Sequence, residues 1–207
     1  EMCGNGARCI SRYAFVNKIA GSKMTFETGA GLVNSEILKG RSVKVLLNNP
    51  GIMKLYNDIE IDDINYDCSY IELGNPGLPH AVVKYNLKEA DTNKLGEIGS
   101  KIRYYDGFPK GANVNFFQVL NENTALVKTY ERGVEDFTLA CGTGSASTAV
   151  ALILKGYLKG NNVKIIVDGG ELFIEVERTD DIIEKLYLIG DTNIVAIGKV
   201  MDEDLII

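Results

Sequence analysis

Two cysteines stand at the start of closely similar motifs, and this arrangement is suited to acid/base chemistry. Cys3 and Cys141 are each followed by Gly-x-Gly and then by a helical pattern. The start of a helix presents free N–H groups and the positive end of the helix dipole, which favour an anion and lower the pKa of a nearby thiol. Because glycine keeps side chains away from the backbone, the same N–H groups can hold a carboxylate. We therefore expect two reactive thiols beside two carboxylate-binding loops.

The repeat extends beyond the two loops. The segment 26–32 after the first helix is matched by 167–172 after the second, at nearly the offset that relates the two cysteines. Two like halves that face one another would bring both motifs to one cleft. The second motif is preceded by strands and a helix from about residue 70, whereas nothing precedes the first. If the halves are equivalent, about seventy residues of the first half are missing before Glu1.

Composition narrows the class of protein. The 207 residues carry a formal net charge of −6 without a basic run, which argues against a nucleic-acid partner. The longest apolar run, at 149–154, is far shorter than the roughly 20 residues that cross a bilayer, so we expect no membrane partner. No signal peptide opens the chain, and four cysteines without a dense framework fit a reducing compartment. We predict a cytoplasmic globular protein.

Periodicity places the loops among helices and strands. Helices are predicted at 6–20, 92–104 and 144–158. The first carries Ile10, Tyr13, Ala14 and Ile19 on or near one face, and Cys9 is expected to be a small buried residue of that helix. Strands are predicted at 23–27, 32–38, 42–47, 70–73, 81–85, 115–120, 125–130, 163–167, 172–176, 186–190 and 193–200.

Two thiols on opposite sides of a clamped amino acid could invert its configuration. One thiolate would remove the Cα proton, and the other thiol would deliver a proton to the opposite face. The charge of the carbanion would spread into the carboxylate, where fixed N–H dipoles stabilise it. The reference pKa of a thiol, near 8.5, can be tuned toward neutrality by those dipoles. Neither a Schiff-base lysine setting nor a metal-ligand cluster is recognisable, so we expect no cofactor and no metal.

Several motifs together resemble one family. Residues 2–9 read Met-Cys-Gly-Asn-Gly-Ala-Arg-Cys, residues 129–133 read Thr-Tyr-Glu-Arg-Gly, and residues 138–144 read Thr-Leu-Ala-Cys-Gly-Thr-Gly. With residues 107–109 and 112–114, they resemble the diaminopimelate epimerase family over essentially the whole chain. The resemblance implies an α+β fold of two pseudo-symmetric halves, each a mixed, mostly antiparallel sheet wrapped around a central helix. It also implies a cofactor-independent two-base epimerisation of LL-diaminopimelate to the meso form, in lysine and peptidoglycan precursor biosynthesis.

The resemblance also assigns residues and boundaries. It implies that Cys3 and Cys141 are the acid/base pair and that His80 is a polar neighbour of the thiols. The substrate-binding positions that match are Gly4, Asn5, Asn113, Glu131, Arg132, Gly142 and Thr143. Residues 1–65 would be the rest of the N-terminal half, 66–192 the C-terminal half, and 193–207 a strand returning to the first half. The expected partner is a small amino-acid substrate, and a homodimer is possible.

Some alternatives remain open. The family usually has Asn-Pro-His, whereas here Leu78 stands two places before His80, so either Asn75 reaches the substrate through a longer loop or that contact is absent. A related racemase or epimerase acting on proline, hydroxyproline or histidine is the second candidate. A lone histidine is more often structural, and Glu131 with Arg132 could be an exposed pair at a strand end. Outside the enzymes, an anion- or amino-acid-binding protein and a redox-sensing thiol protein are the alternatives.

Overall fold

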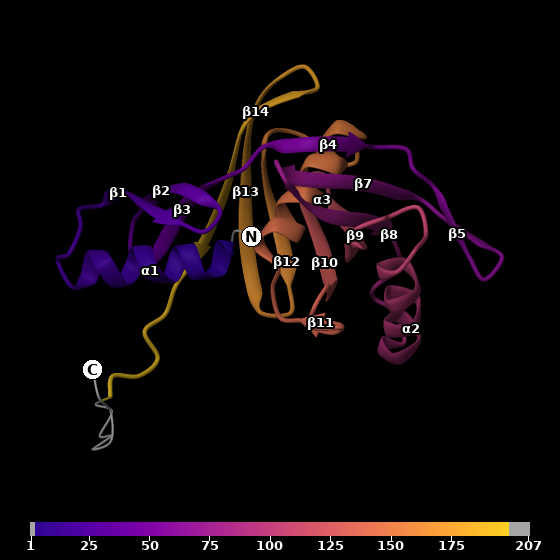
Figure 1. Cartoon of the computed structure of the whole chain (residues 1–207), viewed down its shortest axis with the longest axis horizontal. Helices are drawn as coiled ribbons and strands as arrows, with labels where there is room; N and C mark the ends of the chain where they lie inside the picture. The colour runs from indigo at the N-terminus through magenta and orange to yellow at the C-terminus, as the bar shows by residue number, and fades with distance from the viewer. Residues whose placement is uncertain (1–2, 199–207) are drawn as a thin grey trace.

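The structure, a computed structural model, describes residues 3–198 (Figure 1). Its helices are α1 (Gly4–Val16), α2 (Thr92–Arg103) and α3 (Gly142–Leu154). Its strands are β1 (Lys23–Thr28), β2 (Gly31–Ile37), β3 (Ser42–Leu47), β4 (Pro50–Lys54), β5 (Ile59–Ile61), β6 (Ile64–Tyr66), β7 (Cys68–Gly74), β8 (Gly77–Lys84), β9 (Asn113–Asn121), β10 (Thr124–Glu131), β11 (Asp136–Thr138), β12 (Asn162–Val167), β13 (Gly170–Thr179) and β14 (Ile182–Asp191).

One twelve-stranded sheet organises the described residues. Its order is β1-β2-β3-β14-β13-β12-β10-β9-β8-β7-β4, with β11 paired to β10. Neighbouring strands are antiparallel except for β8 with β9 and β10 with β12. The chain is therefore a sheet-dominated α+β fold. β14 pairs with β3, so the last strand within residues 3–198 joins the segment β1–β3 to the rest of the sheet.

Near the first cysteine loop, α1 lies against the three-stranded segment β1–β3. Alternate residues of β3 are buried, and α1 contacts β2 and β3. The contact is made by small side chains: Ala7 and Ser11 are buried, and the Ser11 hydroxyl donates to the Ser35 hydroxyl at 2.7 Å. This packing fixes the direction in which the N-terminus of α1 points.

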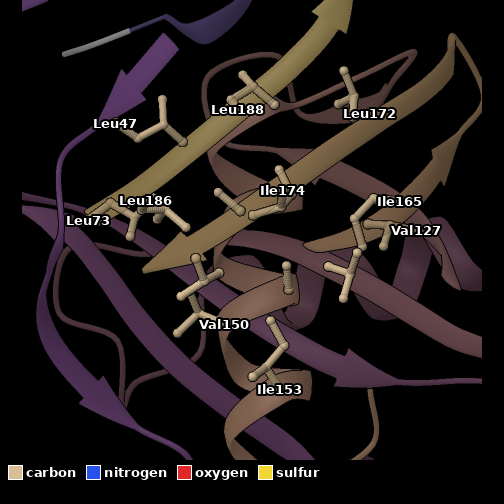
Figure 2. Packing of buried hydrophobic residues seen from close by; sticks show 14 of the residues in the cluster. Leu47, Leu73, Val127, Val150, Ile153, Ile165, Leu172, Ile174, Leu186 and Leu188 are labelled. Atoms are coloured by element: carbon tan, nitrogen blue, oxygen red, sulfur yellow. The ribbon is translucent and has the colours of Figure 1, made fainter. Parts of the chain in front are cut away.

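Near the second cysteine loop, α3 runs through the centre of the sheet and is buried from Gly142 to Ile153. Two of its buried hydroxyl groups bond back to the preceding turn: the Ser145 hydroxyl donates to the Cys141 carbonyl at 2.9 Å, and the Thr148 hydroxyl donates to the Gly144 carbonyl at 2.8 Å. Figure 2 shows Val150 and Ile153 among side chains from β3, β7, β10, β12, β13 and β14. Burial of each such side chain contributes roughly 1.5–3 kcal/mol, so α3 is firmly anchored.

The remaining helix, α2, covers a second cluster of buried apolar side chains. Asp91 caps it by accepting from the Lys94 N–H at 2.9 Å. Leu95, Ile98 and Ile102 form its buried face, and its bounds confirm the helix predicted at 92–104. This cluster lies behind β9, the strand that carries Asn113.

The prediction for the first helix is wrong in two respects. The helix ends at Val16 rather than at residue 20, and the predicted apolar face is largely exposed: Ile10 is 53% and Tyr13 58% exposed. The prediction that Cys9 is buried is also wrong. The reason is that the opposite, small-residue face of α1 packs on β2 and β3, and no described element covers the side with Cys9 and Ile10.

Other boundaries differ for local reasons. The helix α3 ends at Leu154 instead of residue 158, because Gly156 has a φ of +73° and the N–H of Tyr157 turns back to the Leu152 carbonyl at 2.8 Å. No strand forms at 193–198, where Val195 is 88% exposed, so that part of the predicted final strand is wrong. The rest of 193–207 lies outside the described residues. The strands β4, β5, β6 and β11 are too short or irregular to show an alternating pattern, and the sequence analysis missed them. The domain boundaries remain a prediction.

Candidate active site

The first thiol caps α1. Cys3 has an extended backbone, with φ −111° and ψ 106°, and its Sγ accepts the Gly6 N–H at 3.4 Å. The Cys3 carbonyl accepts the Ala7 N–H, which is the first bond of the helix. The thiol is exposed, so a substrate can reach it.

The second thiol caps α3 in the same way. Cys141 has φ −112° and ψ 111°, and its Sγ accepts the Gly144 N–H at 3.3 Å and lies 3.5 Å from the Thr143 hydroxyl. Glycine is required at 144, because a Cβ there would lie 2.1 Å from Oδ1 of the buried Asn115. The second loop therefore packs tightly against the side chain of Asn115.

The two helix starts meet directly. A Cβ on Gly4 would lie 3.8 Å from the Cα of Gly142 and 2.6 Å from the Leu188 side chain. A Cβ on Gly142 would lie 2.6 Å from the same Leu188 side chain, so glycine at both positions leaves room for Leu188 beside the two loops. The Asn5 side chain also crosses between them, because its Nδ2 donates to the Ala140 carbonyl at 3.0 Å.

The meeting point forms a cleft of about 190 Å³. All nine residues predicted as the acid/base pair and the substrate contacts line it, and Leu78 and Ala140 complete the lining. The nine predicted residues come from four places far apart in the chain: the two loops, the start of β9 and the end of β10. The sheet brings together what the sequence separates.

The lining of the cleft also carries charged groups that are held in place by hydrogen bonds. The Asn113 Oδ1 accepts the Arg132 backbone N–H at 2.8 Å, and its Nδ2 donates to the Pro79 carbonyl at 3.3 Å. Glu131 accepts from the Thr138 hydroxyl at 2.8 Å, and Arg132 Nη1 donates to the Lys110 carbonyl at 3.2 Å. A fixed carboxylate beside a fixed guanidinium can bind an amino-acid terminus at both of its charges.

Comparisons with known proteins agree with this geometry. The family model described as diaminopimelate epimerase matches residues 73–195. Two curated relatives are the diaminopimelate epimerases of Aquifex aeolicus, 38% identical over 99% of this chain, and of a Hydrogenobaculum species, 37% identical over 98%. The chain belongs to the diaminopimelate epimerase family. It spans 71% of the length of each of these two relatives.

The fold of this diaminopimelate epimerase family member also occurs in solved structures. A hydroxyproline epimerase from Agrobacterium vitis matches with a TM-score of 0.65 at 17% identity, over 92% of this chain and 63% of that chain. A PhzF-family phenazine biosynthesis protein from Bacillus anthracis matches with a TM-score of 0.68 at 11% identity, over 92% and 73%. These matches establish the shared fold.

In this diaminopimelate epimerase family member, burial changes the expected thiol chemistry. Desolvation raises the pKa of Cys141 to about 11, and the nearby Glu131 carboxylate also raises it. The Thr143 hydroxyl and the Gly144 N–H act in the opposite direction but are outweighed. The expectation that the helix start would bring this pKa toward neutrality is therefore wrong for Cys141, because the thiol is only 8% exposed.

His80 is a buried neighbour of the site. It is fully buried on β8, and its Nδ1 lies 3.3 Å from Nδ2 of Asn115. Burial, with a smaller contribution from the positive charge of Arg132, lowers the pKa of His80 to about 3. The imidazole is therefore neutral near pH 7, and it is not among the residues that line the cleft.

The hairpin between β7 and β8 separates Leu78 from Asn75. Leu78 lines the thiol cleft, whereas Asn75 lines an adjoining cavity of about 350 Å³ that also contacts Leu78 and Thr143. The structure places no Asn75 side chain in the thiol cleft itself.

The sequence analysis missed two supporting residues, Asn115 and Arg8. Asn115 accepts from the Thr129 hydroxyl at 3.0 Å and forms the base under the second loop. Its signal was the spacing of two from Asn113, which puts two amides on one face of a buried strand. Arg8 gave no such signal, because an arginine within a helix is ordinary.

The described residues contain no group of three or more His, Cys, Asp or Glu side chains positioned to hold a metal ion. No helix within residues 3–198 is long and apolar enough to cross a membrane.

Proposed function

We propose that this chain is an isomerase that epimerises LL-diaminopimelate to the meso form by two-base proton transfer between thiols. The observation that carries the proposal is the meeting of two thiol-capped helix starts in one cleft. The substrate is inferred from the family to which the chain belongs. The reaction would belong to the biosynthesis of lysine and peptidoglycan precursors.

The two loops would hold the substrate by its reacting end. Free N–H groups at the starts of α1 and α3 point toward the same cleft, and a carboxylate between them would be stabilised by both helix dipoles. The substrate Cα would then lie between Cys3 and Cys141. As the Cα proton leaves, negative charge moves into that carboxylate, where the same N–H groups stabilise it more strongly.

For one direction of the reaction we assign the role of proton donor to Cys141 and the role of base to Cys3. The burial of Cys141 supports this assignment, because it raises the pKa of that thiol and favours its protonated form. The Cα proton passes to the Cys3 sulfur, and the Cys141 proton passes to the opposite face of the carbanion. Cys3 is then a thiol and Cys141 a thiolate, and the reverse reaction uses them with the roles exchanged.

The charged lining of the cleft favours a substrate with a second amino-acid terminus. The Glu131 carboxylate can accept from an ammonium group, and the Arg132 guanidinium can donate to a carboxylate, so such a terminus would gain charge-assisted hydrogen bonds that the side chain of proline or alanine cannot form. Leu78 is the apolar exception in this lining.

Isotope incorporation tests the two-base mechanism. Starting from one stereoisomer in heavy water, early product should carry deuterium at Cα, whereas recovered substrate should carry little, because each face has its own proton source. Mass spectrometry of both stereoisomers below about one-tenth conversion measures this. Equal early labelling of substrate and product would mean one shared base and would contradict the proposal.

A substrate panel tests the assignment to diaminopimelate. LL-diaminopimelate, proline, hydroxyproline and histidine are compared by kcat/KM in the wild type and in Arg132→Ala. We expect diaminopimelate to be preferred and the preference to fall by about 10²-fold in Arg132→Ala, as for loss of a charged hydrogen-bonding partner. Arg178→Ala is the control, since Arg178 bonds Asn161 far from the cleft. A faster turnover of proline or histidine would refute diaminopimelate as substrate.

We further propose that the reaction takes place in the cytoplasm, which the four free cysteines support. A homodimer remains a prediction.

A further inference from the structure

Arg8 occupies an unusual place between the two loops. It lies one turn after Gly4 on α1, and its side chain is buried, with 7% of the residue exposed. A Cβ on Gly142 would lie 3.9 Å from Nη1 of Arg8, and a Cβ on Gly190 of β14 would lie 3.3 Å from its Nε. The guanidinium therefore packs against the backbone of the second loop and of the strand that joins the sheet segments.

A chain of two hydrogen bonds connects Arg8 to the second thiol loop. Nη2 of Arg8 donates to Oδ1 of Asn5 at 3.0 Å, and Nδ2 of Asn5 donates to the carbonyl of Ala140, the residue before Cys141. A primary amide has one accepting and one donating end. Because Arg8 can only donate, it holds the oxygen of Asn5 toward itself and directs the NH₂ group to the second loop.

Within residues 3–198, Arg8 has no carboxylate partner. Its Nε and Nη1 atoms are buried without a hydrogen-bond partner, and the titratable groups that act on its charge are the thiols of Cys9 and Cys3. A buried charge without compensation destabilises the folded state. An apolar side chain of similar length would fill the space at lower cost, so packing alone does not explain a guanidinium here.

We propose that Arg8 is a positioning residue that couples the two thiol loops by fixing the orientation of Asn5. Without Arg8, the Asn5 amide can rotate and present its oxygen to the Ala140 carbonyl, where the two oxygens repel each other. The loop carrying Cys141 then loses its direct tie to the loop carrying Cys3. The effect on turnover rests on the proposed epimerase function, whereas the tie itself does not.

Kinetics of matched variants test the effect on turnover. Arg8→Met should lower kcat by about 10²-fold, the loss expected when reacting groups are misplaced by about 1 Å, while KM changes less than threefold. Arg8→Lys keeps a donor for Asn5 and should recover at least tenfold of that loss. Arg12→Met, one turn further along α1 and packed on Phe15, should keep wild-type kcat. The melting temperature of Arg8→Met should not fall. A drop in melting temperature together with an unchanged kcat would overturn the positioning role.

Hydrogen exchange tests the tie without any substrate. Backbone amides at 140–144 should exchange at least tenfold faster in Arg8→Met than in the wild type, and at the wild-type rate in Arg12→Met. In Asn5→Ala the same amides should exchange faster, and adding Arg8→Met should cause no further increase, because Arg8 acts through Asn5. Unchanged exchange in a folded Arg8→Met, or exchange in Arg8→Lys that is as fast as in Arg8→Met, overturns the proposal. Failure of the wild type to turn over diaminopimelate would instead refute the proposed function and leave the tie standing.

Discussion

The two thiol loops share one backbone conformation and differ in almost everything around it. Their φ and ψ angles agree within 5°, from −111° and 106° to −112° and 111°, and each sulfur accepts the N–H three residues on. Yet Cys3 is exposed, whereas Cys141 is buried beside Glu131 and Thr143. The comparison teaches that a short motif fixes how a thiol caps a helix, while packing decides the environment that sets its reactivity.

The helices behind the loops show the same contrast. The helix α3 is buried along almost its whole length, whereas α1 leaves Ile10, Tyr13 and Val16 exposed. Figure 1 shows α3 within the curve of the sheet and α1 along the outer side of β1–β3. Two similar loop motifs are therefore attached to helices that are buried to different extents.

The largest expected effect comes from removing either thiol. Cys3→Ala and Cys141→Ala should each lower kcat by about 10²–10⁴-fold, because each removes one of two proton transfers. Steady-state epimerisation of LL-diaminopimelate measures this. The controls Cys9→Ala and Cys68→Ala should keep turnover within about threefold, since neither residue lines the cleft. A wild-type kcat in Cys141→Ala would mean that the second loop has a structural role only. The two loops would then share a backbone conformation but not a catalytic role.

The unequal burial of the helices predicts unequal stability effects. Leu152→Ala in α3 should lower the free energy of unfolding by about 2–5 kcal/mol, because it leaves a cavity in the core. Ile10→Ala in α1 should change it by no more than about 0.5 kcal/mol, because that side chain is 53% exposed. Urea unfolding measures both. A loss at Ile10 as large as that at Leu152 would show that the exposed face of α1 is covered in solution.

The glycines at equivalent positions in the two loops, Gly6 and Gly144, show how tightly each loop is packed. Gly144→Ala should lower the free energy of unfolding by about 1–3 kcal/mol, since the new Cβ would meet the Asn115 amide, which is fixed by several hydrogen bonds. Gly6→Ala should be neutral or stabilising by up to about 1 kcal/mol, because a Cβ there meets only the Cys3 sulfur at 3.6 Å. Thermal unfolding of both variants measures the difference, and equal destabilisation would mean that the loops are equally constrained.

The smallest expected effect is on stability at alkaline pH. Burial raises the pKa of Cys141 from the ordinary value of 9.0 to about 11 in the folded state, so the folded state binds more protons than the unfolded state between these values. The resulting stabilisation is fully present below pH 9 and is lost as pH rises toward 11, and about 1.4 kcal/mol of it is lost by pH 10. Urea titrations at pH 8 and 10 should show a smaller decline in Cys141→Ala than in the wild type. The same decline in both would place Cys141 in contact with water.

Local patterns determined much of this protein in advance. The strand at 42–47 and the helix at 92–104 appear in the structure as predicted, because each reflects a pattern of close neighbours in the sequence. The motifs likewise indicated which nine residues to expect in one site, and those nine line one cleft. What the individual residues do there remains a prediction.

Long-range packing decided the rest. The exposure of Cys9, the raised pKa of Cys141 and the low pKa of His80 depend on which elements surround each side chain, and the local sequence does not encode this. The pairing of β14 with β3 brings the two loops together across more than a hundred residues. The tie from Arg8 through Asn5 to Ala140 exists only after that pairing, so the sequence by itself supplied the two thiols and the tertiary structure determined how they face each other.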